Sequence, residues 1–187
     1  MIQSTAMDDP TARQKATPQQ AAELARTYGR MVFSAAYQVT GDHAHAEDVQ
    51  QDVFLRLMQR PMTPVDSWPA LLKTLAVRMA IDHLRRSTRW QRLLPVWMAG
   101  SDGVAEQGAD HHAERSQQAA RLRRALARLP AREAECFALR CLHGMDVADI
   151  ARSTGMTANH VSVSLHRATR KLESELGTTT PTTEENA

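Results

Sequence analysis

The chain has 187 residues, enough for one domain or two small ones. It is 42% apolar, 4% aromatic and 24% charged, which is typical of a soluble helical protein. Its formal net charge of +2 indicates no particular partner, so the distribution of charge along the chain carries the information.

Cys136 and Cys141 lie in an apolar helical stretch, and we predict buried, reduced thiols rather than a disulfide or a metal site. The N-terminal residues lack the apolar core of a signal peptide. No apolar run approaches the roughly 20 residues that span a bilayer. We therefore expect a cytoplasmic protein with no membrane insertion.

Residues 1–17 are polar and are predicted to form a disordered tail. From Pro18 the apolar residues recur at helical spacing, and Gly41 and Asp42 are predicted to end this helix and begin the next. The second helix has one apolar face, made of Ala46, Val49, Val53 and Leu57.

The first turns of the second helix are acidic, with four acids and no lysine or arginine between Asp42 and Asp52. Acids at this end of a helix complement the helix dipole. They could equally form a docking face for a basic or polar partner, with an exposed Leu55 as apolar anchor. The residues alone leave both interpretations open.

A third helix is predicted after the prolines of the 61–67 loop, with Ser67 as its cap and Pro69 in its first turn. Its far end is basic and carries Trp90. Melted DNA is bound by cations that contact phosphates and by rings that stack on bases. Arginines at a helix C-terminus also complement the dipole, which is the alternative. We expect nucleic-acid binding here because one acid, Asp82, stands against five arginines, Arg78, Arg85, Arg86, Arg89 and Arg92.

Residues 93–117 lose helical periodicity and are predicted to be a flexible linker. A second helical module follows over 118–176, and 177–187 is predicted to be a disordered tail. Within the module, Asp146 is expected to cap a short helix that Gly155 ends, and Thr157 is expected to cap a longer one. This pattern predicts a helix-turn-helix.

The longer helix has an apolar side and a polar, basic side, and no acid lies between Thr157 and Leu172. A helix fits the major groove, where Asn, Ser and Arg read base edges and Lys or Arg neutralises phosphates. A surface helix with a basic face is the alternative. The DNA-binding candidates are Thr157, Asn159, His160, Ser162, His166, Arg167, Arg170 and Lys171.

Together these segments resemble a bacterial sigma factor of the extracytoplasmic function (ECF) group of the sigma-70 family. The resemblance rests on the helix-turn-helix and on three further motifs, AEDVQQDVFLRL (46–57), SWPALLKTLAVRMAIDHLRR (67–86) and RALARLPAREAECFALR (124–140). It implies an all-α fold with sigma region 2 over 18–92 and sigma region 4 over 118–176, joined by the linker.

The resemblance also implies roles and partners. The chain would be a transcription initiation factor without catalytic residues, metal or cofactor. Its partners would be core RNA polymerase (β′ clamp helices and β flap), promoter DNA and an anti-sigma factor. The residues implied to bind polymerase are Asp48, Gln51, Asp52, Leu55 and Arg56. Those implied for the −10 element are Trp68, Arg78, Met79, Asp82, Arg85, Arg86 and Arg89.

The resemblance assigns the helix-turn-helix candidates to the −35 element. Met79 departs from the family, because many members have an asparagine there whose hydrogen bonds a methionine cannot make.

Two other classes compete with this interpretation. A helix-turn-helix repressor or response-regulator output domain would use residues 157–171 but leave the acids of 42–52 without a role. A DNA-modifying enzyme lacks support, since no carboxylate pair, Cys/His triad or Gly-rich phosphate loop stands out in the sequence.

Overall fold

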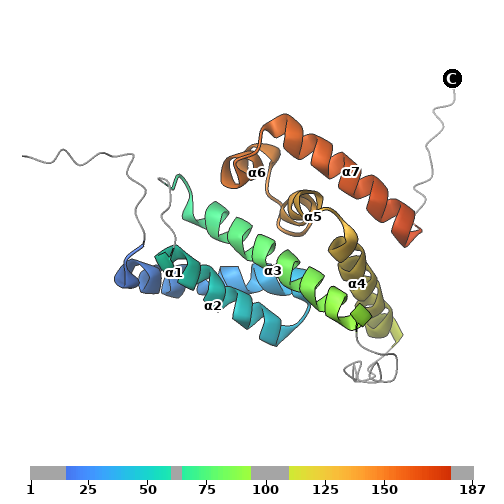
Figure 1. Ribbon diagram of the computed structural model, residues 1–187, viewed down its shortest axis with the longest axis horizontal. Coiled ribbons are helices and arrows are strands. Elements are labelled where there is room, and N and C mark those ends of the chain that lie inside the picture. Colours follow the sequence, from blue (N-terminus) through green and yellow to red (C-terminus); the bar gives the residue numbers. More distant parts are fainter. Residues whose placement is uncertain (1–15, 60–64, 94–109, 178–187) are drawn as a thin grey trace, which may run out of the picture.

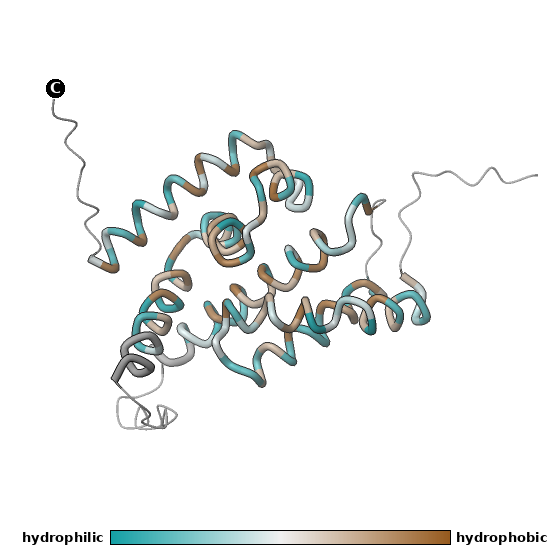
Figure 2. Tube along the Cα trace, turned by 180° about the vertical axis from the view of Figure 1, so that it is seen from behind, coloured by the Kyte–Doolittle hydropathy of each residue, from teal (hydrophilic) through white to brown (hydrophobic). Residues whose placement is uncertain are grey.

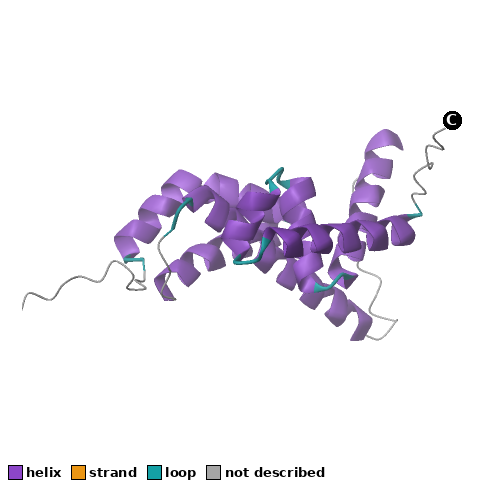
Figure 3. Ribbon diagram, turned by 90° about the horizontal axis from the view of Figure 1, so that it is seen from above, coloured by secondary structure: helices purple, strands orange, loops and turns teal. Residues whose placement is uncertain are grey.

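The computed structural model describes residues 16–59, 65–93 and 110–177 (Figure 1). The predicted tails lie almost wholly outside these ranges, as do residues 60–64 and 94–109. Figure 3 shows that the elements of the described ranges are helices, so the prediction of an all-α fold is confirmed. No helix within these ranges is long and apolar enough to cross a membrane.

Seven α-helices and one π-helix make up the described chain. The first three are α1 (Pro18–Thr40), α2 (His43–Gln59) and α3 (Trp68–Leu93). The others are α4 (Asp110–Arg128), α5 (Ala131–Phe137), the π-helix η2 (Ala138–Leu142), α6 (Val147–Thr154) and α7 (Ala158–Leu176).

The central helix is α3. It packs against α1 and α2 on one side and against α4, α5 and α6 on the other (Figure 1). In turn, α7 packs on α4, α5 and α6. The helix-turn-helix is therefore carried on the same body as the first three helices.

Local sequence signals set the ends of the helices. Thr17 and Gln20 form a reciprocal capping box at the start of α1. Gly41 ends α1 in the left-handed conformation, with φ 66°, and Asp42 Oδ1 accepts the His45 backbone N–H at 2.8 Å to cap α2.

Caps also define the helix-turn-helix. Asp146 and Thr157 cap α6 and α7 by accepting the backbone N–H three residues later, and Gly155 forms the left-handed turn between them. These predicted caps are confirmed. In Figure 2, hydrophobic and hydrophilic residues alternate along α7, as a helix with one buried side requires.

The start of α4 differs from the prediction. The helix begins at Asp110, inside the segment 93–117 that was predicted to be a linker. The stretch from 110 to 117 has little apolar periodicity, which is why it read as a linker. Alanine, glutamate, arginine and glutamine are good helix formers, however, and they allow the helix to extend beyond its packed part.

The two predicted modules share one hydrophobic core. Leu57 and Leu72 from the first three helices belong to the same buried cluster as Leu126, Leu139 and Ile150 from the later ones. Polar groups join the modules as well, since Thr74 Oγ1 on α3 donates to Ser153 Oγ on α6 at 2.9 Å.

Cys136 is buried, as predicted, but Cys141 is exposed. The prediction for Cys141 was wrong because it assumed an uninterrupted α-helix. The His143 N–H instead bonds to the Ala138 carbonyl five residues back, at 3.2 Å. This wider π turn shifts the helical phase and moves Cys141 off the core side. Burial raises the pKa of Cys136 to about 11, which keeps its thiol protonated and unreactive.

Candidate nucleic-acid interface

A charged groove of about 530 Å³ runs between α2 and α3. It brings together residues that the sequence analysis had assigned to two different roles, polymerase binding and −10 binding. Gln51 and Leu55 do not line it but are exposed on α2 beside it. The lining residues are Asp48, Val49, Asp52, Arg56, Met79, Asp82, His83, Arg85, Arg86 and Arg89.

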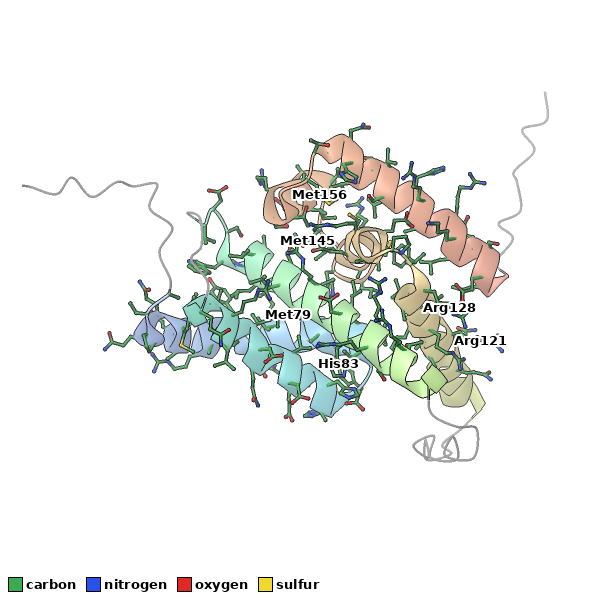
Figure 4. All side chains as sticks on the ribbon, viewed as in Figure 1. Met79, His83, Arg121, Arg128, Met145 and Met156 are labelled. Carbon is green, nitrogen blue, oxygen red and sulfur yellow. The ribbon has the colours of Figure 1, made fainter. Side chains whose placement is uncertain are left out.

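Met79 and His83 lie one turn apart on α3 and both line the groove (Figure 4). Met79 is half-buried and packs against the core, so its thioether is held in place while one side remains open to the groove. It gives the groove an apolar surface among charged side chains.

The sequence analysis missed His83 and its partner on α2, His45. Their ring centroids are 4.0 Å apart. Burial lowers the pKa of His83, and the neighbouring His45 and Arg86 lower it further, whereas Asp48 and Asp42 raise it. A neutral ring therefore lies in the groove at neutral pH. Helical spacing could have revealed His83, because it follows Met79 by four residues and precedes Arg86 by three.

Arg78 points away from this groove, toward α5. Its guanidinium Nη2 lies 2.7 Å from Glu135 Oε1, and its Nε donates to the same oxygen at 2.8 Å. Glu135 is only 3% exposed and also pairs with Arg132 at 3.0 Å. Arg78 thus neutralises a buried acid of the second module, and it does not join the arginines at 85, 86 and 89.

Trp68 is also apart from the basic cluster. It is the first residue of α3 and packs, half-buried, against the core. Arg86 follows it by about 27 Å along the helix axis, at 1.5 Å per residue. The side chains of Trp90 and Arg92 lie outside the described residues.

The outward side of α7 is exposed to solvent, whereas Arg78 and Trp68 of α3 are partly covered. Every one of its predicted DNA-binding residues is exposed, while Val161, Ser164, Ala168 and Leu172 are buried. An open groove of about 380 Å³ crosses its C-terminal half and is lined by His166, Arg167, Arg170, Lys171, Ser174 and Glu175.

Three of the candidate DNA-binding residues at α7 already have intramolecular bonds: Thr157, which caps the helix, and Ser162 and Lys171 within it. The Thr157 hydroxyl accepts the His160 N–H at 3.2 Å, and Ser162 Oγ donates to the Ala158 carbonyl at 3.0 Å. Lys171 Nζ lies 2.8 Å from Glu133 Oε2, an ion pair that fixes α7 to α5. Glu133 and Glu135, which the sequence analysis missed, are thus buried acids that each hold one candidate DNA-binding cation. They stand two residues apart in the apolar helix after Pro130.

The two parts of the chain match two families. Residues 24–90 match Sigma-70 region 2, and residues 119–172 match Sigma-70, region 4. The ECF RNA polymerase sigma factor SigL of Mycobacterium tuberculosis is 31% identical over 161 residues, which cover 81% of this chain and 88% of SigL. The chain belongs to the ECF sigma factor family.

The probable ECF sigma factor SigI of the same species is 30% identical over 152 residues. The match covers 79% of this chain and 52% of SigI, so the chain spans about half the length of that relative. The first family match falls on α1–α3 and the second on α4–α7, in the order that the ECF resemblance implied.

The fold is also similar to that of a solved structure, the sigma factor RpoE of Bartonella quintana in complex with the anti-sigma factor NepR. The TM-score is 0.51 at 20% identity, over 85% of this chain and 98% of RpoE. At this identity the similarity concerns the arrangement of helices.

Proposed function

We propose that the chain is an alternative sigma factor that binds core RNA polymerase, directs it to promoters through −10 and −35 contacts and helps to initiate transcription. The observation that carries the proposal is the outward side of α7, where all the polar and basic candidates are exposed in a chain that matches both sigma regions. The −35 element would be read there by Asn159, His160, His166 and Arg167, with Arg170 near a phosphate.

Core polymerase would dock on the outward side of α2. Asp48, Gln51 and Asp52 are exposed there, and Arg56 is half-buried beside them. Leu55 is 46% exposed, which is unusual for a leucine in the described chain, and it supplies an apolar anchor amid the acids.

The −10 element would enter the groove between α2 and α3. Arg85, Arg86 and Arg89 supply positive charge for the backbone, and Met79 supplies an apolar contact for an unstacked base. Asp82 faces the same groove and can accept a hydrogen bond from a base edge. Trp68 lies far along α3 from the arginines of the groove, so it would contact a different part of the DNA. Arg78 would bind DNA only after its ion pair with Glu135 had broken.

The chain itself would carry out no catalysis, since polymerase forms the phosphodiester bonds, and it would work in the cytoplasm. Because RpoE of Bartonella quintana was solved with an anti-sigma factor, we also propose an anti-sigma partner for this chain. Such a partner would cover the faces of α2 and α7.

In vitro transcription tests the proposal. Purified chain, bacterial core polymerase lacking sigma and fragmented DNA from the source genome should give transcripts with defined starts. An Asp48→Ala/Gln51→Ala double variant should lose most of them, because it removes two exposed polar groups from the docking side of α2.

The matched control is His43→Ala, which removes an exposed polar side chain of the same helix that points about 140° away from Asp48 and about 80° away from Gln51 around α2. It should transcribe like the original chain. If no start-specific transcript appears and the chain alone shifts specific duplex DNA, the repressor alternative holds and the sigma proposal fails.

A further inference from the structure

Val163 is an exposed apolar residue on the outward side of α7. It is 38% exposed and is one of four large hydrophobic residues exposed in the described chain, with Tyr37, Leu55 and Leu176. The core side of α7 is already complete without it, since Val161, Ala168 and Leu172 are buried. Val163 therefore does little for the stability of the fold.

Helical geometry puts Val163 in the middle of the candidate DNA-reading residues. It follows Asn159 by four positions, and it precedes His166 by three and Arg167 by four. Residues at these spacings are neighbours on a helix surface. An isolated aliphatic side chain is thus surrounded by amide, imidazole and guanidinium groups.

The surroundings favour a nucleic acid over a protein as the partner of this side chain. Between Ala158 and Lys171 the helix has no acid, and its exposed basic residues suit a polyanion. Val163 is also smaller and less exposed than Leu55, at 38% against 46%, and so offers a protein partner less apolar area.

The major groove offers one apolar group on the base edges, the C5-methyl of thymine. We propose that Val163 is a specificity-determining residue of α7 that selects thymine at one position of the bound duplex by contact with this methyl group. The inference rests on the proposed function, because it requires α7 to lie in the major groove of a −35 element.

Uracil tests the contact directly, because it pairs like thymine but lacks the methyl group. Promoter duplexes recovered from the transcription experiment are resynthesised with each −35 thymine replaced in turn by uracil. Binding of holoenzyme, made from core polymerase and the full chain, is then measured for the original sequence and for Val163→Ala.

We expect one thymine, or two adjacent ones, at which uracil weakens binding of the original holoenzyme about fourfold, the effect of one buried methyl group. Val163→Ala should weaken binding to the thymine duplex by a similar factor and should no longer distinguish thymine from uracil at that position. Val163→Thr, which keeps one methyl group, should retain an intermediate preference.

Leu176→Ala is the matched control, since it truncates another exposed aliphatic residue of α7 but lies near the end of the helix, away from the reading residues. It should keep full sensitivity to uracil. Alanine favours helix, so neither truncation should disturb α7, which far-UV circular dichroism checks.

The inference is overturned if transcripts form normally but every thymine-to-uracil change affects the original chain and Val163→Ala alike. A loss in Val163→Ala that is equal at all promoters and independent of uracil would instead assign Val163 to a protein contact, which also overturns it. If the original chain gives no start-specific transcript, the proposed function fails and the inference falls with it.

Discussion

The two candidate DNA-binding helices, α3 and α7, differ in how much of their surface other helices cover. Five α-helices and the π-helix η2 pack around α3, so its basic residues are divided between the groove toward α2 and the contact with α5. The helices that contact α7 do so on one side, and its opposite side stays exposed.

This difference shows that a count of arginines on a helix does not give the charge available to DNA. Arg78 and Arg85 lie on the same helix, yet the first neutralises the buried Glu135 and the second lines the groove. On α7 a similar division affects only Lys171, whose pair with Glu133 leaves it half exposed. The candidate DNA-binding side of α7 is thus largely free of intramolecular ion pairs, whereas one of the candidate arginines of α3 is held by α5.

The prediction with the largest expected effect tests whether α3 and α7 belong to one domain that unfolds cooperatively. Leu139, on η2, is fully buried in the core that joins the modules. Leu139→Ala should lower the free energy of unfolding by about 2–5 kcal/mol, through lost burial and the cavity left behind. Urea denaturation followed by circular dichroism should give a single transition. Two separated transitions would show that α3 and α7 belong to independent domains.

A fall in pH should reduce the stability of the packing between α3 and the later helices. Burial lowers the pKa of His143 to about 4, with a further contribution from Lys73 on α3, and its Nε2 is buried without a hydrogen-bond partner in the described structure. The folded pKa is below the ordinary value of 6.5, so the unfolded chain binds the proton more readily.

The contribution of His143 to stability is therefore complete above pH 6.5 and is lost as pH falls toward 4. Unfolding at pH 5 should be easier than at pH 7.5 by about 2 kcal/mol. In His143→Gln this pH dependence should shrink, whereas His166→Gln, at an exposed position of α7, should keep it. An unchanged slope in His143→Gln would contradict the assignment.

The smallest expected effect is the difference in stability between variants of the two buried acids, Glu135 and Glu133. Each of these acids pairs with one candidate DNA-binding cation. Glu135→Gln should cost roughly 1–3 kcal/mol of unfolding free energy, because Glu135 is almost fully buried and pairs with two arginines. Glu133→Gln should cost less than about 1 kcal/mol, because Lys171 is half exposed to solvent.

A double-mutant cycle with Arg78→Gln measures the first pair, and one with Lys171→Gln measures the second. Equal coupling energies in the two cycles would mean that Arg78 and Lys171 are held equally strongly by their buried acids. That result would contradict the difference between α3 and α7.

Most of the fold was predictable because the helix caps and the spacing of apolar residues in the sequence agree with the observed helices. Asp42, Asp146 and Thr157 cap the helices that their positions predicted, and Ala46, Val49, Val53 and Leu57 are buried as their spacing required. Cys141 was predicted wrongly because a π turn changes the period, and no residue type announces such a turn.

The candidate site was less predictable where it depends on contacts between distant segments. Arg78 and Arg85 look alike in the sequence, and only the position of α5 distinguishes them. The same holds for His45 and His83, which come from two helices. The periodicity of a helix predicts on which side of that helix a residue lies. It does not predict which other element packs against that side.

The core that runs through both modules has a consequence for measured affinity. A ligand that needs α3 free of α5 binds only the minority of molecules in which the two are apart. Its apparent Kd is the intrinsic Kd divided by that minority fraction, so a fraction of about one in a hundred weakens apparent binding about a hundredfold. A first ligand that holds the modules apart restores the lost affinity for a second one. The two are then cooperative even if they never touch.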